Sequence, residues 1–211
     1  MTQRAMFSII VLAAGLSTRF KRNKLLEQVN GQPLIRGVVS AALGSKAEEV
    51  VVVLGYQAEK VRSVLKGLRC KLAVNEEFRK GQSSSVKVGV RATSKDARAI
   101  LILPGDVALI TSKAIDKVID EYLRTGGLIV VASHKGVAGH PILFDRSLFP
   151  EVLRVREKSK GLKAVVYRHR NQVRLAEVGS DVVLYDFDTA DDFRRRLPSW
   201  RDEPGRGQAK G

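Results

Sequence analysis

The chain has 211 residues, 44% of them hydrophobic, which suits one globular domain with a sizeable core and excludes a disordered chain. No apolar run reaches the roughly 18 residues of a membrane span. The single cysteine, Cys70, excludes internal disulfides, so we expect a cytoplasmic protein. One cysteine with three scattered histidines also excludes ordinary zinc sites, so we expect any metal ligands to be oxygens. The net charge of +15 favours anions, which leaves a solvated basic surface, an anionic substrate and a nucleic acid as alternatives.

Short apolar runs rich in Val, Ile and Leu predict strands that are buried on both faces. They occupy residues 7–13, 50–54, 71–74, 99–103 and 128–132. Segments with helical periodicity alternate with them. These predicted helices begin at Pro33 and cover 58–68, 83–91 and 112–123. The alternation predicts an α/β fold, a Rossmann-like three-layer sandwich with a mostly parallel sheet.

The pattern changes after residue 125. We expect a loop at 136–141, a short apolar run at 142–144 and strands at 173–178 and 182–187, which would add small antiparallel pieces to one edge of the sheet. Residues 1–197 are predicted to form a single domain, and residues 198–211, rich in Arg, Gly and Pro, a flexible basic tail. Such sheets bind ligands beyond the carboxyl ends of their strands, so the loops that follow the strands are the candidates for a site.

The loop after the first predicted strand, residues 12–24, combines small residues with four cations. Backbone N–H groups near Gly15 would cradle oxyanions, and Arg19 and Lys24 would bind phosphate. The loop lacks the Gly-Lys-Ser/Thr ending of a P-loop and the three glycines of the dinucleotide fingerprint. It therefore predicts an anion site, with a solvated basic turn as the alternative.

Three later segments place polar side chains at predicted strand ends. Asp106 would either face the crevice or act as a turn or cap residue. The serines at 83–85 would either cap the next helix or accompany its free N–H groups towards a polar ligand. Asp186 and Asp188 share one face of a strand end, so with Asp106 they would form an oxygen-only Mg²⁺ site. Asp188 or Thr189 would also serve as a cap for the last helix.

Five motifs in this order resemble the MobA-like nucleotidyltransferases, and most closely the molybdenum-cofactor cytidylyltransferases. The motifs are Leu12-Ala13-Ala14-Gly15-x-Ser17-x-Arg19-Phe20-x3-Lys24, Asn75-x5-Gly81-x-Ser83-x-Ser85, Gly105-Asp106, Gly139-His140-Pro141 and Asp186-Phe187-Asp188-Thr189.

The resemblance implies a role for each motif. It implies nucleotide-binding residues, which are Leu12, Ala13, Ala14, Gly15, Arg19, Lys24, Gly81, Gln82, Ser84 and Ser85. It implies that Arg19, Lys24 and Asp106 are catalytic and that Asp106 and Asp188 hold Mg²⁺. It also implies an acceptor side formed by Gly139, His140 and Pro141.

The activity implied by the resemblance is transfer of CMP from CTP to the phosphate of molybdopterin, with a molybdoenzyme as a client. GTP or another NTP with a different phosphorylated acceptor remains open, as does a non-catalytic binding protein. No membrane partner is expected, and no specific nucleic acid, because aromatic residues do not interleave with the basic ones. Three departures from the family pattern are Lys21 for a glycine, Ala108 for a proline, and the absence of an Asp near Gly161, which leaves the acceptor open.

Overall fold

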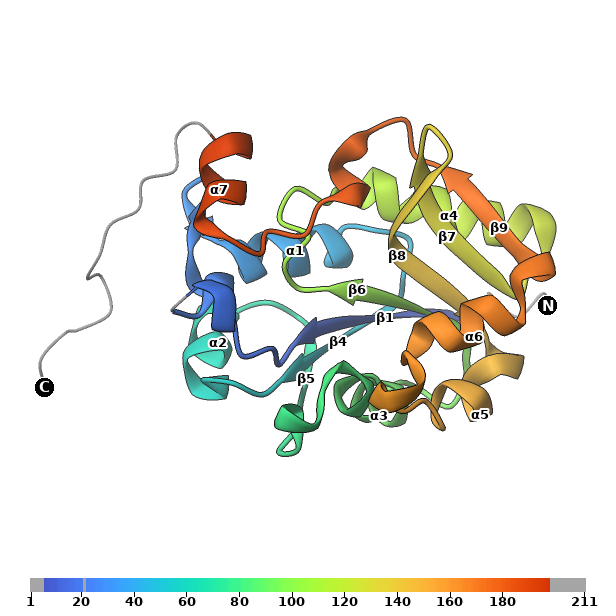
Figure 1. Ribbon diagram of the computed structural model, residues 1–211, viewed down its shortest axis with the longest axis horizontal. Helices are drawn as coiled ribbons and strands as arrows, with labels where there is room; N and C mark the ends of the chain where they lie inside the picture. Colours follow the sequence, from blue (N-terminus) through green and yellow to red (C-terminus); the bar gives the residue numbers. More distant parts are fainter. Residues whose placement is uncertain (1–5, 21, 198–211) are drawn as a thin grey trace, which may run out of the picture.

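The first strand of the sequence lies in the interior of the sheet. In the computed structural model, which describes residues 6–20 and 22–197, β1 (Met6–Ala13) pairs parallel with β4 (Glu49–Leu54) on one side and β6 (Ala97–Pro104) on the other (Figure 1). β5 (Lys71–Val74) extends the sheet beyond β4. The expectations for Lys21 and for the tail at 198–211 lie outside the described residues.

One antiparallel strand interrupts the sheet. β8 (Val137–Asp145) pairs antiparallel with both β6 and β7 (Ile129–His134), and β9 (Val173–Glu177) pairs parallel with β7. The strand order is β5-β4-β1-β6-β8-β7-β9, and a separate ladder joins β2 (Gln28–Val29) to β3 (Gln32–Pro33). The predicted mostly parallel α/β sheet is confirmed, but its antiparallel strand lies inside the sheet and not at the edge.

Helices cover both faces of the sheet because alternate residues of each central strand point to opposite sides. Ile9 and Val11 of β1 share one core with α1 (Leu34–Leu43), α2 (Ala58–Val64), α4 (Ser112–Thr125) and α7 (Ala190–Arg196). Ile10 shares the other core with α3 (Gln82–Ala92), α5 (Phe149–Val152) and α6 (Leu162–Arg168). The three layers are visible in Figure 1. Among the described residues, no helix combines the length and the apolar character needed to cross a membrane.

Two local predictions are wrong. Residues 136–141 are not a loop, because Lys135 and Gly136, both with positive φ, form a two-residue turn from which β8 starts at Val137. Residues 182–187 are not a strand. They begin within a 3-10 helix, Asp181–Leu184, whose backbone packs against β8: a Cβ on Gly139 would lie 2.1 Å from the carbonyl oxygen of Val183.

Candidate active site

The loop after β1 is fixed by its own polar side chains. Asn23 is buried and caps a 3-10 turn, since its Oδ1 accepts a hydrogen bond from the backbone N of Leu25 at 3.1 Å. The Ser17 hydroxyl accepts one from the backbone N of Lys24 at 3.3 Å. Among residues 6–20 and 22–197, apart from Gly15 and its two chain neighbours, no atom lies within 4 Å of the place where a Cβ on Gly15 would point. The backbone at Gly15 is therefore open to a ligand while Lys24 is held in position.

Lys24 joins two carboxylates from distant parts of the chain. Its Nζ lies 2.5 Å from Oδ2 of Asp106 and 2.5 Å from Oδ1 of Asp188. Arg19 reaches the second oxygen of Asp188, with Nη2 2.6 Å from Oδ2. The side chain of Lys24 is 12% exposed, whereas that of Arg19 is 69% exposed and is free to follow a ligand. Four residues that the sequence placed in one site thus lie together.

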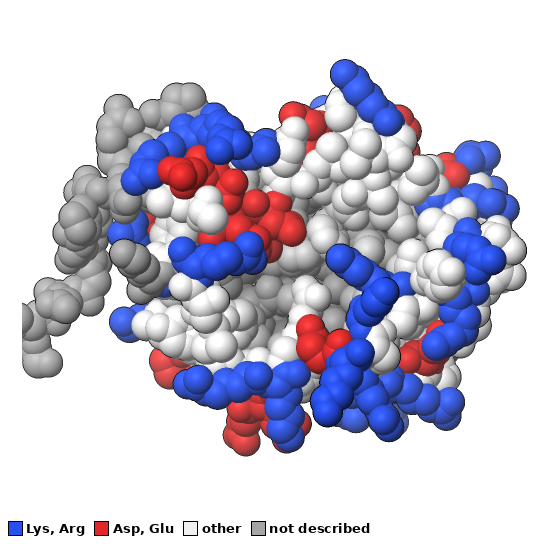
Figure 2. Space-filling model, viewed as in Figure 1, with Lys and Arg blue, Asp and Glu red and all other residues white. Residues whose placement is uncertain are grey.

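These side chains line a cavity of about 260 Å³, together with Gly15, Ser17 and Thr18. Figure 2 shows acidic side chains gathered beside a hollow and Lys and Arg side chains around it. A larger hollow of about 330 Å³ lies along α2 and β5, with Leu65, Leu68 and Leu72 in its lining. It holds no converging carboxylates or phosphate-binding loop, so the smaller cavity is the candidate active site.

The electrostatics of the cavity favour an added cation. Burial opposes the charge on Lys24, but Asp106 and Asp188 outweigh it and raise the pKa of Lys24, which keeps the ammonium charged. Loss of solvent contact, together with the charges of Asp106 and Asp188, raises the pKa of Asp186 to about 6, even though this residue remains partly open to water. Three carboxylates therefore face two cations.

Close packing of strand ends holds Asp106 in place. The backbone N of Gly105 donates to the carbonyl of Leu12 at 2.9 Å, and a Cβ on Gly105 would lie 2.8 Å from that oxygen. The backbone N of Phe187 then donates to the carbonyl of Asp106 at 3.1 Å. Glycine is needed at 105 because the ends of β1 and β6 approach so closely.

The sequence left two caps open for the last helix, and Thr189 is the cap of α7. Its hydroxyl accepts from the backbone N of Asp192, and the carboxylate of Asp192 accepts from the backbone N of Thr189, which is a capping box. Asp188 is thereby left to face Lys24. The rings of Phe187 and Phe193 pack 4.9 Å apart, which ties this segment to the core.

The loop at 75–85 follows β5 and lies beside the loop after β1. A Cβ on Gly55 would lie 2.7 Å from Cβ of Ala14 and 2.8 Å from Cβ of Phe78, so the two loops meet at Gly55. The N-cap of α3 is Gly81, without a side-chain cap bond, so the serines do not cap this helix in the ordinary way. Gln82, the first residue of α3, is exposed.

The Gly-His-Pro segment lies within β8. Gly139 packs against the Val183 carbonyl, and Pro141 is buried. His140 is half-buried, and its Nδ1 has no hydrogen-bond partner among the described residues. Burial lowers the pKa of His140, while Asp106 acts on it in the opposite direction and Lys163 adds to the lowering. His140 thus lies within electrostatic reach of the Asp106 carboxylate and of Lys163 on α6.

The structure also shows a carboxylate that sequence reasoning missed. Glu157 accepts hydrogen bonds from Ser83, 74 residues earlier in the chain, and so joins the segment before α6 to the start of α3. In the sequence, this region is marked only by the absence of an Asp near Gly161. No local pattern marks Glu157, because its partner is far away in the sequence.

Known proteins share both this sequence pattern and this fold. The family model described as "MobA-like NTP transferase domain" matches residues 9–173. The Bifunctional protein GlmU of Desulfotalea psychrophila is 30% identical over 141 residues, which cover 66% of this chain and 41% of that protein. The chain thus spans less than half the length of this relative.

Two solved structures cover nearly the whole chain. Rv0371c from Mycobacterium tuberculosis H37Rv has a TM-score of 0.82 at 27% identity, with 93% of this chain and 100% of that chain covered. The structure of Rv0371C in complex with manganese has a TM-score of 0.77 at 26% identity, with 92% and 100% covered.

Proposed function

Because the chain belongs to the family of MobA-like NTP transferase domains, we propose that it transfers the CMP group of CTP to the phosphate of molybdopterin and releases pyrophosphate. The observation that carries this proposal is the convergence of Arg19, Lys24, Asp106 and Asp188 on one cavity next to the open backbone of Gly15. Cations and a glycine loop suit phosphates, and paired carboxylates suit a divalent metal ion.

The barrier to this reaction is electrostatic. The oxygen of an acceptor phosphate is already ionised at neutral pH, so the transfer needs no general base, and attack is opposed by the charges of two anions. We assign Arg19 and Lys24 to the β- and γ-phosphates, where they would stabilise the leaving pyrophosphate. Arg19 is exposed and would capture the phosphates, whereas Lys24 is fixed and would position them.

The two carboxylates fit a magnesium ion. Asp106 and Asp188 each direct one oxygen at the same cationic atom, Nζ of Lys24. Among the described residues, no group of three or more His, Cys, Asp and Glu side chains has the spacing of a metal site. Mg²⁺ is commonly held by one or two carboxylates plus substrate phosphates and water. When bound, Mg²⁺ would neutralise charge on the phosphates. Lys24 would then be released towards the nucleotide.

The base and the acceptor are the finer part of the proposal. Cytosine and molybdopterin follow from the resemblance of the Ser-rich loop and of Gly139-His140-Pro141 to the cytidylyltransferases. An acceptor role for His140 is consistent with the effect of the Asp106 charge on its pKa. The proposal includes a cytoplasmic location and a molybdoenzyme client. GTP or another phosphorylated acceptor is the second candidate, because the segment at 159–162 lacks the family's Asp.

A pyrophosphate-release assay tests the proposal. We expect release with CTP, molybdopterin and Mg²⁺, and none with excess chelator. Asp106→Asn should lower kcat by at least about a hundredfold, since it removes a carboxylate that would hold Mg²⁺ at the reacting phosphates. Asp120→Asn is the matched control, because Asp120 pairs with Lys46 on the exposed surface. Normal turnover of Asp106→Asn would exclude the metal role, and release with other nucleotides or acceptors only would favour the second candidate.

A further inference from the structure

The loop proposed to hold the base has few free polar groups of its own. Nδ2 of the buried Asn75 donates to the hydroxyls of Ser84 at 2.8 Å and Ser85 at 2.9 Å. Ser83 donates from its hydroxyl and from its backbone N to Oε2 of Glu157, at 2.8 and 3.0 Å. All three serine hydroxyls therefore already have a hydrogen-bond partner within the protein, which limits what they can offer to a base.

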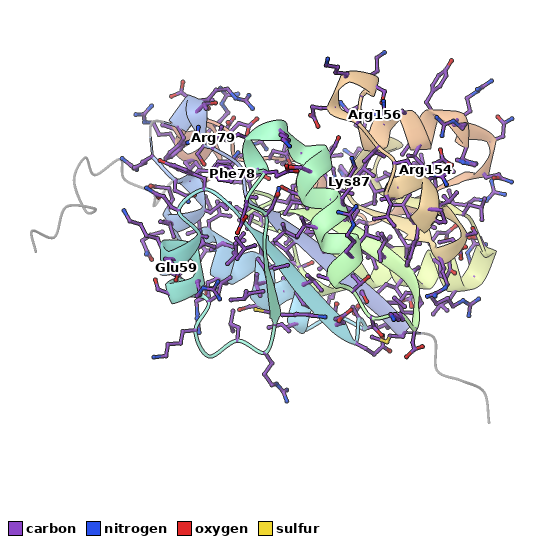
Figure 3. The ribbon with its side chains drawn as sticks, turned by 90° about the horizontal axis from the view of Figure 1, so that it is seen from below. Glu59, Phe78, Arg79, Lys87, Arg154 and Arg156 are labelled. Atoms are coloured by element: carbon purple, nitrogen blue, oxygen red, sulfur yellow. The ribbon has the colours of Figure 1, made fainter. Side chains whose placement is uncertain are left out.

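Glu157 is fixed over the start of α3. It begins a 3-10 helix, Glu157–Ser159, between α5 and α6. A Cβ on Gly81, which has a φ of +98°, would lie 2.7 Å from Cδ of Glu157, so the carboxylate lies directly on this glycine. Figure 3 shows the two segments beside α3, one carrying Phe78 and Arg79 and the other Arg154 and Arg156, the residue before Glu157.

One oxygen of this carboxylate is occupied and the other is free. Oε2 accepts both bonds from Ser83, and within residues 6–20 and 22–197 no donor is found for Oε1. Glu157 is exposed, as is the neighbouring Gln82. The loop thus presents a charged acceptor in a fixed position. Hydrogen bonds to such an acceptor are about twice as strong as neutral ones.

We propose that Glu157 determines the base, because its Oε1 accepts a hydrogen bond from the exocyclic amino group of cytosine and so favours CTP over UTP. Cytosine carries an N4 amino donor where uracil carries the O4 acceptor, which a carboxylate repels. The inference rests on the proposed function, since it takes the phosphates to lie on residues 15–24 and the base on residues 81–85. The loops that contain these two segments both contact Gly55, so the proposed phosphate-binding and base-binding segments lie next to each other.

The test compares CTP with UTP in three proteins: wild type, Glu157→Gln and Glu76→Gln. Both kcat/KM in the pyrophosphate-release assay and Kd by calorimetry are measured with Mg²⁺. Wild type should prefer CTP by at least about tenfold, as expected for one hydrogen bond to a charged group. In Glu157→Gln this preference should shrink by about tenfold, because the amide also offers a donor to O4. Glu76→Gln removes the same charge from an exposed position in the loop at 75–85, beside which Glu157 lies, and should retain the preference.

The outcomes separate the two proposals. Equal use and equal binding of CTP and UTP by wild type would overturn the inference without any variant. If Glu157→Gln does not fold, this comparison in wild type is the test of the inference. An unchanged preference in a folded Glu157→Gln protein would also overturn it. If no acceptor yields pyrophosphate, the proposed function fails, while the Kd values for CTP and UTP still test Glu157.

Discussion

At the residue scale, Lys24 forms ion pairs with two carboxylates that would otherwise repel each other. Its side chain is largely buried, its Nζ lies 2.5 Å from both Asp106 and Asp188, and Asp186 adds a third carboxylate nearby. In the protein alone, the ammonium therefore holds the position that a divalent cation would take. Lys24 and the metal ion would compete for the same oxygens.

This competition predicts the behaviour of Lys24→Met. Without divalent ions the variant should lose about 2 kcal/mol of stability, because partly buried carboxylates lose their partner. Mg²⁺ or Mn²⁺ should restore most of this loss, and should raise the Tm of the variant more than that of wild type. Thermal unfolding at increasing metal concentration measures both effects. Turnover should remain low even with metal, since a phosphate ligand is gone.

Lys46→Met provides the control for this variant. Lys46 pairs with Asp120, and both side chains are 52% exposed, so the substitution should leave the Tm nearly unchanged and the metal response as in wild type. An equal metal response in Lys24→Met and wild type would show that Lys24 does not share ligands with the metal ion.

The residues of the cavity could be named from the sequence because each follows a predicted strand or strand-like run. Arg19, Lys24 and Asp106 follow β1 and β6, and the ends of parallel strands meet at one edge of a sheet. Asp188 follows residues 182–187, which were predicted as a strand but are not one, so its place is supported by the family resemblance and not by a strand end. Glu157 could not be named, because its role depends on a contact with Ser83 that only the fold creates. Gly139 and Pro141 were expected to line the acceptor side, whereas both have packing contacts that the sequence does not show.

At the element scale, a hydrogen bond joins α4 to the end of β8. The hydroxyl of Tyr122 donates to Oδ2 of Asp145 at 2.6 Å, and the ring of Tyr122 packs edge-on against Phe7. Partial burial opposes the charge on Asp145, but the bonds from Tyr122 and Ser147 outweigh it and hold the pKa of Asp145 below its usual value. Burial and the same bond raise the pKa of Tyr122 to about 12.

Tyr122→Phe should therefore destabilise the protein in a pH-dependent way. A carboxyl with a lowered pKa contributes stability that is present above its unfolded pKa and is lost as the pH falls through its folded pKa. We expect the variant to lose about 1 to 2 kcal/mol at pH 7, and the difference from wild type to shrink as the pH falls below the ordinary aspartate pKa of about 4 and Asp145 becomes protonated. Urea unfolding at several pH values measures this. If the stability difference between the variant and wild type stayed constant with pH, the loss would come from packing alone.

The elements themselves were predicted with unequal success, for physical reasons. β1, β4 and β6 are apolar runs buried on both faces, and their pattern marks them clearly. β5 is a strand as predicted, but it is not buried on both faces, because it lies at the edge of the sheet and Val74 is exposed. β8 was divided into a loop and a short run, because Gly136, Gly139 and Pro141 are typical of turns although the strand begins at Val137. Its place between β6 and β7 depends on pairing, which the sequence of one strand does not encode.

At the scale of the whole molecule, a basic surface surrounds an acidic cavity. The chain carries 37 Lys and Arg against 22 Asp and Glu. Yet Asp106, Asp186 and Asp188 lie near Lys24, and Figure 2 shows acidic side chains gathered beside a hollow. Under the proposed function, the long-range field would attract a polyanionic nucleotide and the local carboxylates would bind its metal ion. The attraction by the basic surface acts over a long range, whereas the contacts of the carboxylates act over a short range. Exposed charges are screened beyond about 8 Å at physiological ionic strength, so added salt should weaken the first effect more than the second.

Raising the ionic strength from about 0.05 M to about 0.5 M should therefore raise the KM for the nucleotide several-fold while kcat changes much less, because screening weakens the approach of the substrate and leaves the partly buried contacts at Lys24 nearly intact. Steady-state pyrophosphate release at fixed free Mg²⁺ measures both constants, with sucrose at matched osmolarity as the control. A fall in kcat at constant KM would contradict this account. It would mean that salt acts on the cluster of Lys24, Asp106 and Asp188 directly, and that the basic surface has no part in capturing the nucleotide.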